Sequence, residues 1–134
     1  PVADVFDAIV NEQKICNYFT NATSGPLVEG QRIVWRWDHC DSEYPVLVKR
    51  VVANQLVQLE IDSQEWEKTG EPAYKVQVRL EMESIDGDAT MLSISEAGWL
   101  TDQAGLKGSH ENCSGWTHMA MCLKAYLEHN IDMR

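Results

Sequence analysis

Hydrophobic and polar positions alternate with a period of two through most of the middle of the chain. The alternation covers residues 31–39, 45–52, 55–62, 73–84 and 89–97. Such alternation is typical of β-strands with one buried and one solvent-facing side. The connections between most of these segments are short, so the sequence predicts an antiparallel sheet in which each strand pairs with the next.

Two of these strands show most clearly which side chains share a face. The fourth strand places its apolar and polar residues on opposite faces: Val76, Val78, Leu80 and Met82 against Gln77, Arg79, Glu81 and Glu83. In the fifth strand, Leu92 and Ile94 alternate with Ser93 and Ser95. We therefore expect a sheet that is wet on one face and covered on the other.

The two ends of the chain follow the helical period instead. Apolar residues at i, i+3, i+4 and i+7 predict a short amphipathic helix over residues 2–10, with Pro1 suited to its first turn. Asn11 can cap a second short helix that contains Ile15, Tyr18 and Phe19. Residues 109–130 predict a long helix that covers the sheet. Its apolar stripe consists of Trp116, Met119, Ala120, Leu123 and Leu127. Together these elements predict one α+β domain over residues 1–134.

Charge and composition narrow the classes of partner. Eleven basic residues against 21 acidic ones give a net charge of −10, which disfavours nucleic acid and anionic membrane surfaces. No apolar run approaches the roughly 18 to 20 residues of a membrane span, so membrane insertion is not expected. Residues 1–10 contain two aspartates and no basic cluster, unlike a signal peptide. The four cysteines form no regular framework, and we expect free thiols and a cytoplasmic protein.

No residue pattern in the chain is a transferable catalytic or metal-binding signature. Two clusters contain metal-ligand residue types: His110, Cys113, His118 and Cys122 on the long helix, and residues 38–41 at a strand end. The side chains of the helical cluster point in directions spread around the helix axis, and successive side chains of residues 38–41 point to opposite faces of the strand. Neither cluster can therefore direct its ligands at one metal ion, and no metal is expected. No cofactor is expected and no catalytic residue is assigned. Inward titratable candidates for an enzyme are Arg50, Tyr74, His39 and Glu96.

Three tryptophan side chains are stronger candidates for a binding site than these titratable residues. Trp35 and Trp37 share one face of a strand, and Trp116 lies on the helical stripe that covers the sheet. Such rings either fill a core or line a cavity, and the sequence leaves both open. By alternation Arg50 shares a face with Val46 and Val48. It therefore either points inward, where it requires an anionic partner, or extends its head group into water.

Three segments carry a resemblance to a known family. Residues 1–19, the SEAGW sequence of residues 95–99, and residues 115–134, which open with Gly-Trp and continue into Leu-Lys-Ala-Tyr-Leu-Glu, are similar to the START-like (SRPBCC) superfamily. Within it, they resemble the heat-shock-protein-90 ATPase activator homologue group. Tyr18 and Met119 stand where the family more often has Trp and Leu. Family members also begin with a strand before the first helix, and we expect that this strand precedes Pro1 outside the sequence.

The resemblance implies a helix-grip fold with a cavity between the sheet and the long C-terminal helix. The residues expected to line that cavity are Trp35, Trp37, Val48, Arg50, Val78, Leu80, Trp116, Met119 and Leu123. The first hypothesis is a non-enzymatic carrier or sensor of a hydrophobic or amphipathic small molecule. A chaperone-linked interaction protein and a cyclase- or hydrolase-type enzyme are the alternatives, and a homodimer is compatible with each. Fold alone does not choose between them.

Overall fold

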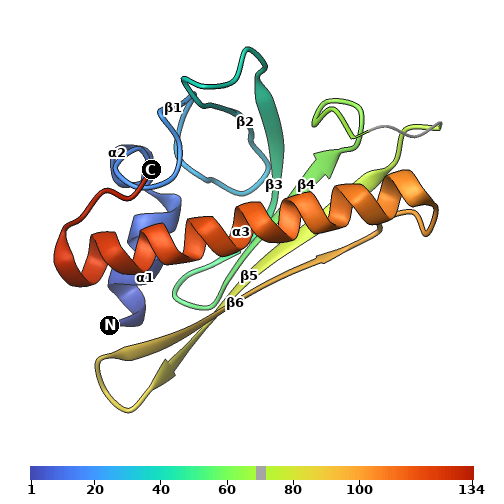
Figure 1. Cartoon of the computed structure of the whole chain (residues 1–134). Helices are drawn as coiled ribbons and strands as arrows, with labels where there is room; N and C mark the ends of the chain where they lie inside the picture. Colours follow the sequence, from blue (N-terminus) through green and yellow to red (C-terminus); the bar gives the residue numbers. More distant parts are fainter. Residues whose placement is uncertain (69–71) are drawn as a thin grey trace.

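One long helix lies across a curled antiparallel sheet in the computed structural model of the chain (Figure 1). The structure describes residues 1–68 and 72–134. Within these ranges the sheet has six strands in the order β1-β2-β3-β4-β5-β6, each antiparallel to its neighbour. The strands are β1 (Ala22–Thr23), β2 (Arg32–Arg36), β3 (Tyr44–Val52), β4 (Leu56–Asp62), β5 (Lys75–Ile85) and β6 (Ala89–Ala97). The helices are α1 (Val2–Val10), α2 (Glu12–Ile15) and α3 (Gln103–His129).

The predicted fold class, a helix-grip α+β domain, is confirmed. All five expected strands are present as β2 to β6, and each pairs with the next. The alternation is also confirmed: on β5, Val76, Val78, Leu80 and Met82 are buried beneath the helices. The sequence did not predict β1, because two residues are too few to show a period.

The second short helix is shorter than expected. The Asn11 side chain caps it, accepting hydrogen bonds from the backbone N–H of Gln13 at 2.9 Å and of Lys14 at 3.2 Å. The helix ends at Ile15, so Tyr18 lies in the turn that follows rather than on the helix. Tyr18 is nevertheless fully buried, and its hydroxyl donates to the carbonyl oxygen of Ala8 at 3.1 Å.

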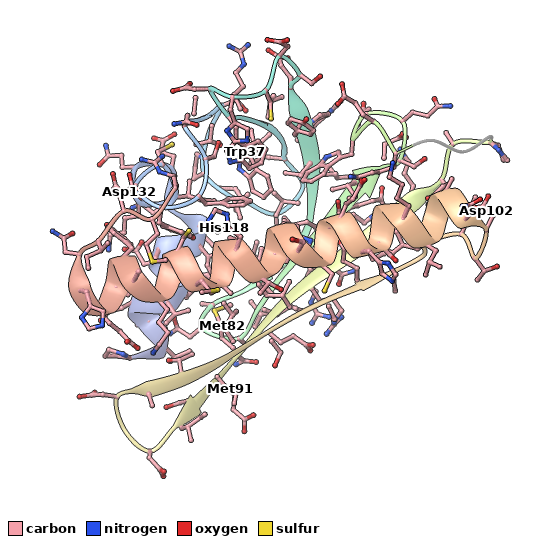
Figure 2. All side chains as sticks on the ribbon, in the orientation of Figure 1. Trp37, Met82, Met91, Asp102, His118 and Asp132 are labelled. Atoms are coloured by element: carbon pink, nitrogen blue, oxygen red, sulfur yellow. The ribbon has the colours of Figure 1, made fainter. Side chains whose placement is uncertain are left out.

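The long helix begins earlier than expected, at Gln103 rather than near Ser109. Asp102, labelled at its start in Figure 2, accepts a hydrogen bond from the backbone N–H of Gly105 at 2.7 Å and caps the helix. The low helix propensity of glycine concealed these first turns in the sequence. Gly105 is required there because a Cβ at this position would lie 2.0 Å from the carbonyl oxygen of Leu100. The loop before α3 therefore packs directly onto its first turn.

Arg50 lies on the solvent-facing side of the sheet, whereas alternation had placed it on the inward face with Val46 and Val48. The β3–β4 register shifts between Val48 and Arg50, so the strand has a bulge at this point. An extra residue in one strand reverses the direction of the side chains that follow it. Arg50 is exposed and lies beside Arg79 in a hollow on the solvent-facing side. Its inclusion among inward-pointing residues is therefore corrected.

The two edges of the sheet differ in length. One edge is the two-residue β1, and the other is the nine-residue β6, which has no partner on its outer side among the described residues. The expectation of a strand before Pro1 is not tested by residues 1–134 and stays a prediction. Among the described residues no helix is both long enough and apolar enough to cross a membrane.

Candidate ligand groove

Two neighbouring hollows separate α3 from the edge strand β6. One has a volume of about 500 Å³ and reaches Val5 of α1, and the other, of about 480 Å³, reaches the Trp99 loop. They share Leu92 of β6 and Ala120 of α3, so they form one continuous depression, which we call the β6–α3 groove. In Figure 1, α3 runs above β6 along this side of the sheet.

The floor of the groove is the inward face of β6. Thr90, Leu92, Ile94 and Glu96 are half-buried, and the residues between them are exposed. Leu92, Ile94 and Glu96 line the hollow near Trp99 together with residues of α3. The period of two thus places one carboxylate in line with two aliphatic side chains on the same face.

Glu96 is the polar centre of the groove. Its Oε1 accepts hydrogen bonds from Trp116 Nε1 at 2.6 Å and from Asn112 Nδ2 at 3.0 Å. Its Oε2 accepts a third from Trp99 Nε1 at 2.7 Å. Asn112 and Trp116 are four residues apart on α3 and therefore point to the same side of the helix. One carboxylate thereby joins β6, the following loop and α3.

All three donors to Glu96 are neutral. The ion pairs found within residues 1–68 and 72–134 involve other carboxylates, and none includes Glu96. Hydrogen bonds from neutral groups satisfy the lone pairs of a carboxylate but leave its net charge uncompensated. The groove therefore contains a half-buried anion beside apolar side chains.

The Trp99 ring is held in place from several sides. It packs edge-to-face on Tyr74, with ring centroids 6.2 Å apart, and lies against Gly108 of α3. A Cβ at position 108 would lie 2.6 Å from the ring. The preceding Gly98 has a φ of +103°, a backbone conformation that favours glycine. These contacts position the indole N–H toward Glu96.

Most of the residues expected to line a cavity belong to the buried core. Six of them are at most 3% exposed: Trp35, Val48, Val78, Leu80, Met119 and Leu123. Trp116, 7% exposed, lines the groove near Glu96, and Leu123 lines its other half. Trp37, labelled in Figure 2, is half-buried, and its Nε1 donates to the carbonyl oxygen of Phe19 at 2.6 Å. Direct contact of these residues with a ligand stays a prediction.

Aromatic rings fill the interior beside β2 and β3. Phe19 packs edge-to-face on Trp35 and on Trp37, with centroids 5.2 and 5.1 Å apart, and stacks on Trp116 at 5.9 Å. Trp66 adds a further edge-to-face contact with Trp35 at 6.4 Å. For this part of the molecule the core alternative therefore holds, and the two hollows that border α3 lie beside β6.

Sequence reasoning placed Glu96 among the inward titratable candidates but did not assign it to the binding site. Of these four candidates, only Glu96 lines the groove. His39 and Arg50 are exposed, and Tyr74 packs edge-to-face on Trp99. The sequence did contain a signal for this placement, because Glu96 is two residues from Ile94 and four from Leu92 and therefore shares their face of the strand. The sequence did not indicate that two indoles and Asn112 would meet this carboxylate.

The cysteines and histidines of α3 do not form a metal centre. Cys122 Sγ lies 3.4 Å from His118 Nε2, one turn away, and burial raises the pKa of the Cys122 thiol. Within the described part of the chain, no three His, Cys, Asp or Glu side chains are grouped closely enough to hold a metal ion. Among those same residues all four cysteines are free.

The arrangement of α3 across a curled antiparallel sheet, with a groove along one side, defines a helix-grip protein of the START-like class. The chain belongs to the family described as activator of Hsp90 ATPase homolog 1-like protein, whose model matches residues 1–128. This confirms the family suggested by the opening, SEAGW and closing segments. No curated protein matches the chain significantly in sequence.

Several solved structures share the fold over nearly the whole chain. Protein SSP2350 from Staphylococcus saprophyticus is 26% identical with a TM-score of 0.77, and the match covers 100% of this chain and 88% of SSP2350. The Aha1 dimer from Colwellia psychrerythraea is 18% identical with a TM-score of 0.71, covering 96% of this chain and 88% of that one. DynU16, from the dynemicin biosynthetic locus, is 17% identical with a TM-score of 0.77, and the match covers 100% of this chain and 45% of DynU16.

Proposed function

We propose that the protein binds a hydrophobic or amphipathic small molecule in the β6–α3 groove and acts as a non-enzymatic carrier or sensor. The observation that carries this proposal is the pair of hollows of about 500 and 480 Å³ that meet at Leu92 and Ala120. Each has a volume typical of small-molecule sites, which are roughly 300 to 1,000 Å³.

The lining of the groove supports the same function. Leu92, Ile94 and Ala120 provide apolar contacts, and Trp116 adds an aromatic ring. Near Trp99 the side-chain hydrogen bonds converge on Glu96. The other hollow has charged side chains at its rim as well as apolar ones, namely Asp4, Asp88, Lys124 and Glu128. A mostly apolar pocket with a small number of fixed polar groups is the usual design of a ligand site.

A substitution at the junction of the two hollows tests this proposal. We expect Ala120→Phe to fill the groove and weaken binding of decanol at least tenfold, as measured by tryptophan fluorescence and by shifts of the indole N–H resonances. Met121→Phe is the matched control, because Met121 is 56% exposed and faces solvent on the next position of α3. Decanol binding that is absent, or equal in both variants, would contradict the proposal.

A chaperone-linked role is the second candidate. It is supported by the family description and by two exposed apolar side chains of α3, Leu106 at 54% and Met121 at 56%. Stimulation of the ATPase activity of purified Hsp90, lost in a Leu106→Ser, Met121→Ser double variant, is the expected result if this surface engages the chaperone. Unchanged ATPase activity at a saturating concentration of the protein would remove this candidate.

Location and assembly complete the proposal. A reducing compartment, the cytoplasm, is compatible with the free cysteines and the net charge of −10. A homodimer is suggested by the dimeric Colwellia relative. Sedimentation of the purified protein measures the oligomeric state directly.

A further inference from the structure

We propose that the β6–α3 groove selects ligands that carry a protonated amine on an apolar body, with Glu96 as the counter-ion of the amine. This inference rests on the proposed function, because it names the chemical class of the molecule that the groove binds. The residues that carry it are Glu96, its three neutral donors and the apolar face of β6.

The first argument is the uncompensated charge of Glu96. Asn112, Trp116 and Trp99 donate three hydrogen bonds, and each of these donors is neutral. A carboxylate has about four lone-pair positions, so one remains for a ligand donor. An ammonium group would both occupy this position and neutralise the charge, forming a charge-assisted bond roughly twice as strong as a neutral one.

The second argument is the aromatic surroundings of the carboxylate. The Nε1 atoms of Trp99 and Trp116 lie 2.7 and 2.6 Å from its two oxygens, so both indoles are next to any group bound there. Both side chains also line the same hollow. These large rings supply apolar contact area for the carbon atoms next to an ammonium group and partly shield Glu96 from water, which strengthens an ion pair formed there.

The third argument is the polarity of the groove along its length. From Glu96 the inward face of β6 continues to Ile94 and Leu92, and Glu96 carries the only charge on this strand. With a rise of about 3.4 Å per residue, Glu96 and Leu92 are roughly 13 to 14 Å apart along β6. An anionic end followed by the apolar stretch from Ile94 to Leu92 complements a molecule with a cationic head and a hydrocarbon tail. Beyond Leu92 the other hollow offers Val5, Leu123 and Leu127 to the tail, next to the charged residues Asp4, Asp88, Lys124 and Glu128.

The same features disfavour an anionic amphiphile. A fatty acid carboxylate placed at Glu96 would oppose a like charge in a partly desolvated site, which is costly. The net charge of −10 acts in the same direction at longer range. A neutral alcohol can donate one hydrogen bond to Glu96 but leaves the charge of the carboxylate in place.

Three probes with the same hydrocarbon chain test the inference: decylamine, decanol and decanoate. We expect decylamine to bind the wild-type protein at least tenfold more tightly than decanol, and decanoate to bind most weakly. Indole N–H resonances of Trp99 and Trp116 should shift on addition of the amine. In Glu96→Gln, the amine should lose its advantage and bind within about twofold of decanol. Glu83→Gln is the matched control, since it removes the same unit of charge from an exposed position on β5.

The outcomes separate this inference from the proposed function. Equal binding of decylamine and decanol by the wild type overturns the amine preference and leaves groove binding intact. If Glu96→Gln and Glu83→Gln lose the amine preference equally, the preference comes from the net negative charge of the whole protein, and the inference is also overturned. If no probe binds, both proposals fail. Indole shifts in the wild type, confined to Trp99 and Trp116, support the site independently of whether Glu96→Gln folds.

Discussion

The two flanks of α3 differ in how they meet the sheet. Beside β2 and β3 the space is filled by aromatic rings, and Trp35 at its centre is 1% exposed. Beside β6 the side chains of the strand are only half-buried, and two hollows remain between strand and helix. One helix on one sheet therefore produces both a close-packed core and an open groove.

Side-chain volume explains this difference. On the filled flank Phe19, Trp35 and Trp66 extend into the space beneath the helix. On the open flank α3 contributes the small residues Ala120 and Ser109 as well as larger ones such as Trp116, and β6 offers aliphatic chains no larger than Leu92. Since interiors pack to near-crystalline density wherever volume allows, an unfilled flank on a stable domain is a place to look for a ligand.

The largest effect should come from opening the filled flank. Trp35→Ala should lower the free energy of unfolding by about 3 to 5 kcal/mol, because it removes a buried ring and leaves a cavity. Ile94→Ala in the groove should cost only about 1 kcal/mol, because its side chain is already partly solvated. Urea denaturation of both variants measures the two values. Equal losses would show that the flanks are packed alike.

Removing the polar centre of the groove should have the next largest effect. Glu96→Leu leaves the two indole N–H groups and the Asn112 amide without their acceptor, which should cost about 2 kcal/mol. Glu96→Gln retains an acceptor oxygen and should cost about half as much. Urea denaturation at pH 7 gives both numbers. A Glu96→Leu variant as stable as the wild type would mean that these hydrogen bonds contribute nothing to holding α3 on β6.

Two glycines of α3 should respond to alanine with opposite signs. Gly108→Ala places a Cβ 2.6 Å from the Trp99 ring, and we expect a net loss of about 1 kcal/mol and a shifted Trp99 indole resonance. Gly115 has nothing within 4 Å of an added Cβ, so Gly115→Ala should gain about 1 kcal/mol from helix propensity alone. Thermal unfolding of the pair checks the signs. A stabilising Gly108→Ala would show that Trp99 moves freely in the groove.

The smallest effect concerns a carboxylate that, unlike Glu96, has a cationic partner. Lys75 Nζ lies 2.6 Å from Asp62, and this hydrogen bond holds the pKa of the Asp62 carboxyl below its usual range. A lowered folded-state pKa stabilises the fold above the unfolded pKa, about 4, and this stabilisation is lost as the pH falls through the folded value.

Asp62→Asn should therefore cost about 0.5 to 1 kcal/mol at pH 7, a modest value because Lys75 is largely exposed. The difference from wild type should shrink as the pH falls below 4. Urea denaturation from pH 7 to pH 2.5 measures it. A difference that stays constant over this range would show that the ion pair is not its source.

Periodicity alone predicted most of the fold. The bounds of β6, residues 89–97, were the same in the sequence and in the structure, because a clean alternation was flanked by turn residues. Arg50 was assigned to the wrong face because a bulge interrupts β3, and a pattern with period two cannot reveal one extra residue. The start of α3 was placed too late because Gly105 and Gly108 are needed where Leu100 and Trp99 of the preceding loop pack against the helix. A hydrophobic pattern with a helical period does not reveal such contacts.

The site was harder to predict than the fold. Whether Trp35 and Met119 line a cavity or fill it depends on the summed volume of side chains from both layers, which no single segment contains. Alternation did place Glu96 on the inward face of β6. Its three donors come from a loop and from a helix up to 20 residues away in sequence, so their convergence required the tertiary structure.

The carboxylate of Glu96 also constrains how the sequence can diverge. Because Trp99, Asn112 and Trp116 all donate to the same two oxygens, a change to an apolar residue at position 96 leaves three inherited side chains unsatisfied at once. A change at any one of the three leaves the other two contacts in place. Descendant lineages should therefore exchange these partners one at a time, while position 96 stays Glu until most of its partners have been replaced.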